Sequence, residues 1–71
     1  MKKILRRHLR HRAIVTLKTG DSFSGVLFDA DSEAIILREA EALGAGEKRT
    51  NLVVDGEVLI LREDLAYIQL P

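Results

Sequence analysis

The segment that closes the chain, LILREDLAYIQLP at residues 59–71, limits the available folds more than any other feature. Leu59, Ile60 and Leu61 follow one another without a polar residue, so a strand here leaves no face for water. A second apolar stretch, LAYIQL, begins after the short polar interruption RED. An exposed apolar edge strand promotes aggregation unless another strand covers it. We therefore expect other strands to cover both faces of this segment.

Chain length and composition suggest that further copies of the same chain cover this segment. With 71 residues and no cysteine, the sequence predicts one small domain with neither a disulfide nor a thiolate metal site to stabilise it. Such domains bury only about 60% of the surface that their unfolded chain exposes, so oligomerisation is a natural source of stability. Hydrophobic residues make up 46% of the chain and there is a single proline, as is typical of a globular protein.

The net charge of zero hides a strong asymmetry. Residues 1–12 carry six basic residues and no acid, whereas residues 13–71 hold the other five bases and all eleven acids. Such a basic arm on an acidic body suggests contact with a polyanion or with the acids of a neighbouring copy. Arginines interrupt the apolar core that a signal peptide needs, and no run approaches the roughly 18 apolar residues of a membrane span. We therefore expect a cytoplasmic protein.

The first segment has the pattern of a helix. Ile4, Leu5 and Leu9 fall on one side of a helix and basic residues surround the remainder. We predict a short amphipathic helix over residues 2–11, within a basic N-terminal region at residues 1–12. Helices this short are marginal alone, so its apolar side is expected to pack on the domain that follows.

Short strands are predicted for the rest of the chain, residues 13–71. The apolar period changes to two, and turns at KTGDS and DADSE separate strands at about residues 13–18, 22–29 and 34–40. Two more strands follow after a long connection, and Asp55-Gly56 forms either a hairpin turn or a bulge there. Gly25 inside a strand marks a bend or a close backbone approach. The predicted fold class is an all-β small barrel, an N-terminal helix followed by a five-stranded, strongly bent antiparallel sheet of the SH3-like kind.

The order of these elements and two short motifs resemble the Sm/LSm family over roughly residues 4–71. The first motif of that family has a glycine in the second strand, then an apolar residue and an aspartate, and the second has an apolar pair followed by Arg-Gly. The matching residues are Gly25, Leu27, Asp31, Ile60, Leu61 and Arg62, with Leu65 and Ile68 in the closing strand. The chain departs from the pattern at two places, because no asparagine follows Asp31 and Glu63 replaces the glycine.

The resemblance implies an Sm-like barrel and a homo-oligomeric ring of six or seven copies. In that family the fourth strand of one subunit pairs with the fifth strand of the next, which would cover the closing segment on both faces. Residues 58–61 and 65–70 would then be subunit contacts. The residues selected for this interface are Val58, Ile60, Leu65, Tyr67 and Ile68.

The resemblance also implies single-stranded RNA as a partner, held near the pore at Asp31 and Arg62. The residues after Asp31 offer no flat side chain or amide for stacking and base-edge hydrogen bonds. Four acids would also lie near the pore and repel phosphate: Asp31, Glu33, Glu63 and Asp64. The alternative role for Asp31 and Arg62 is a turn-stabilising hydrogen bond or salt bridge between adjacent loops.

The basic arm is the better candidate for nucleic-acid binding. Clustered Lys and Arg attract phosphates without sequence specificity, and a ring multiplies the attraction by the number of copies. The residues selected are Lys2, Lys3, Arg6, Arg7 and Arg10. The alternatives are a solvated helix that shields the barrel or pairs with a neighbour's acids, and adsorption to an anionic membrane, which the small apolar face disfavours.

Nothing in the sequence points to catalysis. The paired acids lie in predicted turns. A carboxylate there is solvated, whereas general acid–base catalysis needs a desolvated pocket. His8 and His11 could ligate a metal, but the arginines around them oppose a cation. We therefore predict a non-enzymatic protein with no cofactor, metal, membrane or small-molecule partner. Its function is a ring that binds RNA or other nucleic acid, or alternatively a structural or assembly ring with no nucleic-acid role.

Overall fold

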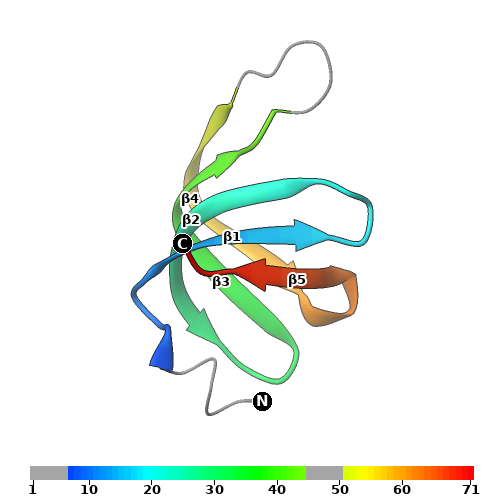
Figure 1. Ribbon diagram of the computed structural model, residues 1–71. Helices are drawn as coiled ribbons and strands as arrows, with labels where there is room; N and C mark the ends of the chain where they lie inside the picture. The colour runs from blue at the N-terminus through cyan, green and yellow to red at the C-terminus, as the bar shows by residue number, and fades with distance from the viewer. Residues whose placement is uncertain (1–6, 45–50) are drawn as a thin grey trace.

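The computed structural model describes residues 7–44 and 51–71 and shows one strongly bent sheet (Figure 1). Its elements are β1 (Arg12–Leu17), β2 (Ser22–Ala30), β3 (Ala34–Ala42), β4 (Leu52–Leu61), the 3₁₀ turn η1 (Arg62–Asp64) and β5 (Leu65–Gln69). The strands lie in the order β4-β3-β2-β1-β5, and all neighbours are antiparallel. The predicted five-stranded bent antiparallel sheet is confirmed. In the described ranges no helix has the length and apolar character needed to cross a membrane.

The predicted N-terminal helix over residues 2–11 is not supported. Residues 2–6 lie outside the described part of the chain; Arg7 has a helical backbone and the residues after it form a turn. Arg10 has a φ of 72°, and its amide donates a hydrogen bond to the carbonyl oxygen of Leu27 at 2.6 Å. A residue with positive φ cannot continue a right-handed helix, and here the backbone bonds to β2 instead.

The core lies on the concave face of the sheet, where the strands alternate as their period of two requires. Ala13 and Val15 of β1 and Leu27 of β2 are fully buried. Leu9 packs against the core from the segment before β1. The complete set of buried side chains is Ala13, Val15, Leu27, Ile35, Leu37, Ala40 and Ile60.

Gly25 allows β2 and β3 to approach closely where the sheet bends. A Cβ atom at this position would lie 3.0 Å from the carbonyl oxygen of Arg38 and 3.1 Å from the Cα atom of Ala40. The register between the two strands shifts beside Gly25, between Ser24 and Val26. The predicted close backbone approach is therefore present, and only glycine fits it without moving the backbone of β3.

A bulge in β4 answers the question that Asp55-Gly56 leaves open in the sequence. These two residues oppose the single residue Glu39 of β3, and regular pairs continue on both sides. Gly56 has a φ of 78° and Glu39 a φ of 51°. The pair is thus a bulge inside one long strand, and a bulge increases the local bend of a sheet. In Figure 1 the ends of β3 and β4 beyond this point project from the body of the barrel.

Candidate nucleic-acid and subunit interfaces

The Asp31 carboxylate closes the turn between β2 and β3. Its Oδ1 atom accepts hydrogen bonds from the backbone amides of Glu33 at 2.8 Å and Ala34 at 2.9 Å. The amide of Asp31 in turn donates to the carbonyl oxygen of Ala34 at 2.9 Å. Aspartate suits this position because its short side chain reaches amides two and three residues ahead. Asp31 therefore stabilises this turn, and its role in nucleic-acid binding stays a prediction.

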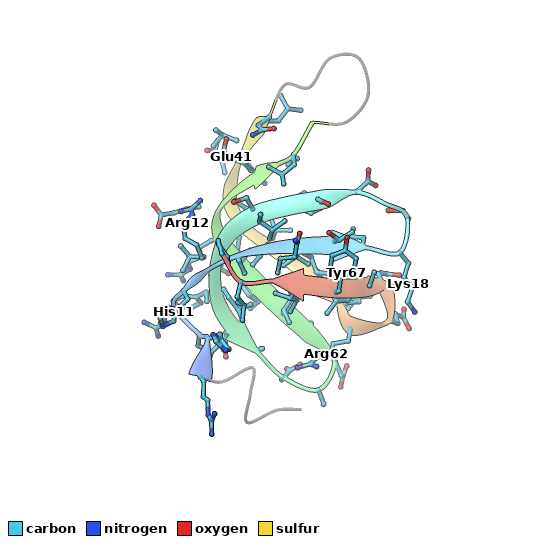
Figure 2. The ribbon with its side chains drawn as sticks, viewed as in Figure 1. His11, Arg12, Lys18, Glu41, Arg62 and Tyr67 are labelled. Atoms are coloured by element: carbon cyan, nitrogen blue, oxygen red, sulfur yellow. The ribbon has the colours of Figure 1, made fainter. Side chains whose placement is uncertain are left out.

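Arg62 attaches η1 to the same turn. Its Nε atom donates a hydrogen bond to the carbonyl oxygen of Asp31 at 2.7 Å, and its backbone amide donates to the carbonyl oxygen of Glu33 at 2.8 Å. Figure 2 shows the Arg62 side chain at the end of the barrel where β2 turns into β3. The structure thus brings Asp31 and Arg62 together, although they are 31 residues apart in the chain.

A shallow depression of about 360 Å³ lies between this turn and η1. It is lined by Ser32, Glu33, Leu61, Arg62 and Glu63. Base stacking uses an aromatic ring or a guanidinium plane, and the lining has no aromatic residue. The Nε–H group of Arg62, which could bond a base edge, already bonds the turn. Two carboxylates in the lining also repel phosphate. The chemistry of this depression does not favour a nucleic acid.

The residues selected in the basic arm are only partly described. Lys2, Lys3 and Arg6 lie outside the described ranges, whereas Arg7 and Arg10 are both exposed. Arg10 is held beside β2 by its backbone hydrogen bond to Leu27. Binding of nucleic acid by these five residues stays a prediction.

No metal-binding cluster of three or more His, Asp or Glu side chains occurs within residues 7–44 and 51–71. The rings of His8 and His11 pack edge to face with their centroids 6.2 Å apart. Each ring therefore has the other as its aromatic neighbour.

The sheet has two open edges, one at each end. β4 and β5 are its outer strands, and each has one side without a partner strand in the described part of the chain. Large apolar side chains beside these edges are exposed: Leu59 by 63%, Leu61 by 42% and Tyr67 by 56%. Free backbone N–H and C=O groups next to apolar side chains favour pairing with another strand.

The residues selected for the subunit interface lie in different environments. Tyr67 is exposed, whereas Ile60 is only 4% exposed and belongs to the core of its own chain. Val58, Leu65 and Ile68 are half-buried and pack against that core. Because side chains alternate along β4, the exposed residues of the predicted contact segment 58–61 are the neighbours of Ile60.

An apolar groove of about 400 Å³ lies between the C-terminal half of β4 and residues of β1 and β2. Its lining combines core residues with exposed ones: Leu17, Phe23, Val58, Leu59, Ile60, Leu61 and Asp64. The groove exists because β4 and β5 lie at opposite ends of the sheet order, so one copy does not close its own barrel.

One surface cluster was not selected from the sequence. The Cζ atoms of Arg10 and Arg38 lie 4.7 Å and 3.5 Å from the centroid of the Phe28 ring. Phe28 follows the buried Leu27, so strand alternation alone places an aromatic ring on the outer face of β2. The sequence alone therefore indicates the position of the ring. It does not predict the contacts with Arg10 and Arg38, because these residues come from separate segments of the chain.

Comparison with solved structures identifies the fold. The P. aerophilum SmAP1 heptamer matches with a TM-score of 0.86 at 17% identity, covering 100% of this chain and 92% of that chain. The Sm protein of Pyrococcus abyssii, solved in complex with a uridine heptamer, matches with a TM-score of 0.80 at 25% identity, covering 99% of this chain and 96% of that chain. This chain has the Sm fold.

The fold of this chain is also similar to that of a chain in the NatC complex bound to CoA. The TM-score is 0.80 at 19% identity, with 94% of this chain and 83% of that chain covered. No protein-family profile and no curated protein matches the sequence. The predicted resemblance to Sm proteins is therefore confirmed by the shape of the backbone.

Proposed function

We propose that this Sm-fold chain assembles into a closed homo-oligomeric ring that binds single-stranded RNA or another nucleic acid without catalysing a reaction. The ring forms when the free edge of β4 in one copy pairs with the free edge of β5 in the next. One observation carries the proposal: a single bent sheet has two different open edges, with exposed Leu59 and Tyr67 beside them. Similar chains are described as a heptamer and as a complex with a uridine heptamer.

The two edges favour a ring over a two-fold dimer. Pairing β4 with β5 joins different surfaces of the two copies, so each contact is head-to-tail and leaves one free edge at each end. Such a chain of subunits ends only when it closes on itself. Closure covers every open edge and fills each apolar groove beside β4. Six or seven copies is the size proposed by analogy with Sm rings.

The native mass tests the ring. Light scattering is expected to give six or seven times the mass of one chain for the wild type. Leu59→Asp and Tyr67→Asp place a charge beside the paired edges and are expected to give single, folded copies by circular dichroism, because neither residue is buried in its own chain. Lys18→Asp, in the exposed β1–β2 turn, is the matched control and should keep the ring. A wild type that is a folded monomer at high concentration contradicts the proposal.

Ile60→Asp is not a useful test of the interface. Ile60 is part of the core of its own chain, so an aspartate there buries a charge without a partner and unfolds the subunit. Loss of the ring in that variant would follow from loss of the fold.

We place the nucleic acid on the basic arm and not at the β2–β3 turn. The arm carries six positive charges in residues 1–12 with no acid, and a ring repeats them in every copy. The depression beside Arg62 has two carboxylates and no aromatic ring. A single-stranded backbone is therefore attracted to the arm by release of its counterions.

A gel shift with oligouridylate at several salt concentrations tests this placement. Binding is expected at low salt and is expected to weaken steeply as salt rises. The comparison variant replaces Lys2, Lys3, Arg6, Arg7 and Arg10 with alanine and should lose most of the binding. No binding by the wild type at low salt contradicts the nucleic-acid function. Unchanged binding by the variant would indicate that the nucleic acid binds at the β2–β3 turn and not at the basic arm.

The acidic depression supports a second candidate, a ring that serves as a structural or assembly component. Glu33 and Glu63 line the place where an Sm ring would hold RNA, and the Nε–H group of Arg62 already bonds the turn. A similar chain is part of the NatC complex. A ring of the expected mass that fails to bind oligouridylate at low salt would favour this function.

A further inference from the structure

Two arginines lie over one aromatic ring on the outer face of the sheet, and a third arginine belongs to the same face. Arg10 and Arg38 both lie over the ring of Phe28, with Cζ atoms 4.7 Å and 3.5 Å from its centroid. Arg12 pairs with Val26, two residues before Phe28 on β2, so its side chain belongs to the same face. Arg38 pairs with Val26 from the other side. We call Arg10, Arg12, Phe28 and Arg38 the arginine cluster.

The arrangement orients Arg10 before any ligand binds. Its backbone is fixed to β2 by the hydrogen bond to Leu27, and its guanidinium lies over the Phe28 ring. A cation–π contact uses the guanidinium's flat face and leaves the N–H groups at its edge free. Those N–H groups form the fork that binds a phosphate with two hydrogen bonds. Because the side chain is already ordered, less rotamer freedom is lost when a phosphate binds.

The charges around the cluster indicate which arginines can bind an anion. Arg38 forms an ion pair with Glu57, with Nε 2.7 Å from Oε2, so its charge is partly balanced. Arg10 and Arg12 make no ion pair within the described ranges. Acids do lie nearby, since a depression of about 800 Å³ at the β3–β4 bend is lined by Arg12, Arg38, Glu39, Glu41, Val53, Val54, Asp55, Gly56 and Glu57. Arg12 shares this depression with four acids of β3 and β4. On the Arg10 side, Asp29 follows Phe28 along β2, and its Oδ1 atom accepts a hydrogen bond from the Ala30 amide.

We propose that the arginine cluster binds a backbone phosphate of a single-stranded nucleic acid, with Arg10 and Arg12 as donors and Phe28 as the residue that positions Arg10. The inference rests on the proposed nucleic-acid function and gives it a site on the folded body of the barrel. An extended polyanion fits better than a lone phosphate, because the basic residues of the arm continue from Arg10 along the chain. Each copy in a ring contributes one such site.

A comparison of two single-charge removals tests the role of Arg10. Arg10→Ala is expected to weaken oligouridylate binding about tenfold and to lower the salt slope by about one. Lys18→Ala removes the same charge at the other end of β1, away from Arg12 in Figure 2, and is expected to weaken binding less than about twofold. Equal losses in the two variants would overturn the site, because net charge alone would then explain binding.

A pair of neutral substitutions tests the positioning role of Phe28. Phe28→Leu removes the ring but no charge, so the affinity is expected to fall about threefold while the salt slope stays that of the wild type. Phe28→Tyr keeps the ring and should bind like the wild type. Circular dichroism and native mass show that each variant is folded and assembled. Wild-type binding by Phe28→Leu would overturn the positioning role.

Failure of the site and failure of the proposed function give different results. If the wild type does not bind oligouridylate at low salt, both the proposed site and the proposed nucleic-acid function are excluded. If the wild type binds and Arg10→Ala binds no more weakly than Lys18→Ala, only the proposed site is excluded. Oligothymidylate binding with the same order of variants supports recognition of the phosphate whatever the sugar. Binding to phosphatidylserine vesicles and not to either oligonucleotide would overturn the nucleic-acid assignment.

Discussion

Gly25 is the residue whose replacement tests the bend of the barrel most directly. In Gly25→Ala the new Cβ atom would lie 3.0 Å from the carbonyl oxygen of Arg38 and 3.2 Å from the Cβ atom of Ala40. Because a neighbouring strand must move, the free energy of unfolding should fall by about 1–3 kcal/mol in urea denaturation. Ser24→Ala, on the adjacent outward position, is the control and should change it by less than about 0.5 kcal/mol. An unchanged stability of Gly25→Ala would show that the strands can separate freely.

Two substitutions of Asp31 separate the effect of its side-chain hydrogen bonds on stability from the effect of its charge. Asp31→Ala removes the acceptor of the Glu33 and Ala34 amides and should lower the free energy of unfolding by about 1–2 kcal/mol. Asp31→Asn keeps a side-chain oxygen at the same place and should lose less than half as much. Thermal unfolding of both variants gives the comparison. Equal losses would mean that the carboxylate's charge, and not its hydrogen bonds to the turn, stabilises this end of the barrel.

Among the strands, β4 depends most on a single unusual backbone conformation. Gly56 has a φ of 78°, and a Cβ atom added there would meet no other atom within 4 Å, so conformation and not space limits what can replace it. Gly56→Val should destabilise the fold by about 1–2 kcal/mol, whereas Gly56→Asn should be tolerated because asparagine adopts positive φ more readily. Urea denaturation of the two variants checks this. Equal stability of the two would argue against the bulge.

For the whole molecule, the ring couples stability to concentration. A subunit that leaves two open edges and an apolar groove gains most of its remaining burial on assembly, so only the ring is expected to be fully stable. The thermal midpoint of the wild type should therefore rise with protein concentration. The midpoint of Leu59→Asp should be lower and independent of concentration. A wild-type midpoint that does not change with dilution, at a constant monomeric mass, would exclude the ring.

Much of this architecture follows from local patterns in the sequence. The strands near residues 13–18, 22–29 and 34–40 and the turn at Asp31 were predicted, because alternation and turn chemistry act over a few neighbouring residues. The close approach at Gly25 was predicted for the same reason. The closing apolar segment also indicated open strand edges, although not which of its side chains remain exposed.

Tertiary structure alone decided the rest. The bulge at Gly56 depends on the register of β4 against β3, and the turn at Arg10 depends on a backbone bond to β2. The stacking of Arg10 and Arg38 on Phe28 joins three segments that sequence spacing does not relate. Ile60 points into the core because the register of β4 pairs it with the buried Ile35 of β3. Local physics thus determined which strands and turns form, and packing between distant segments determined which side chains face solvent and which meet one another.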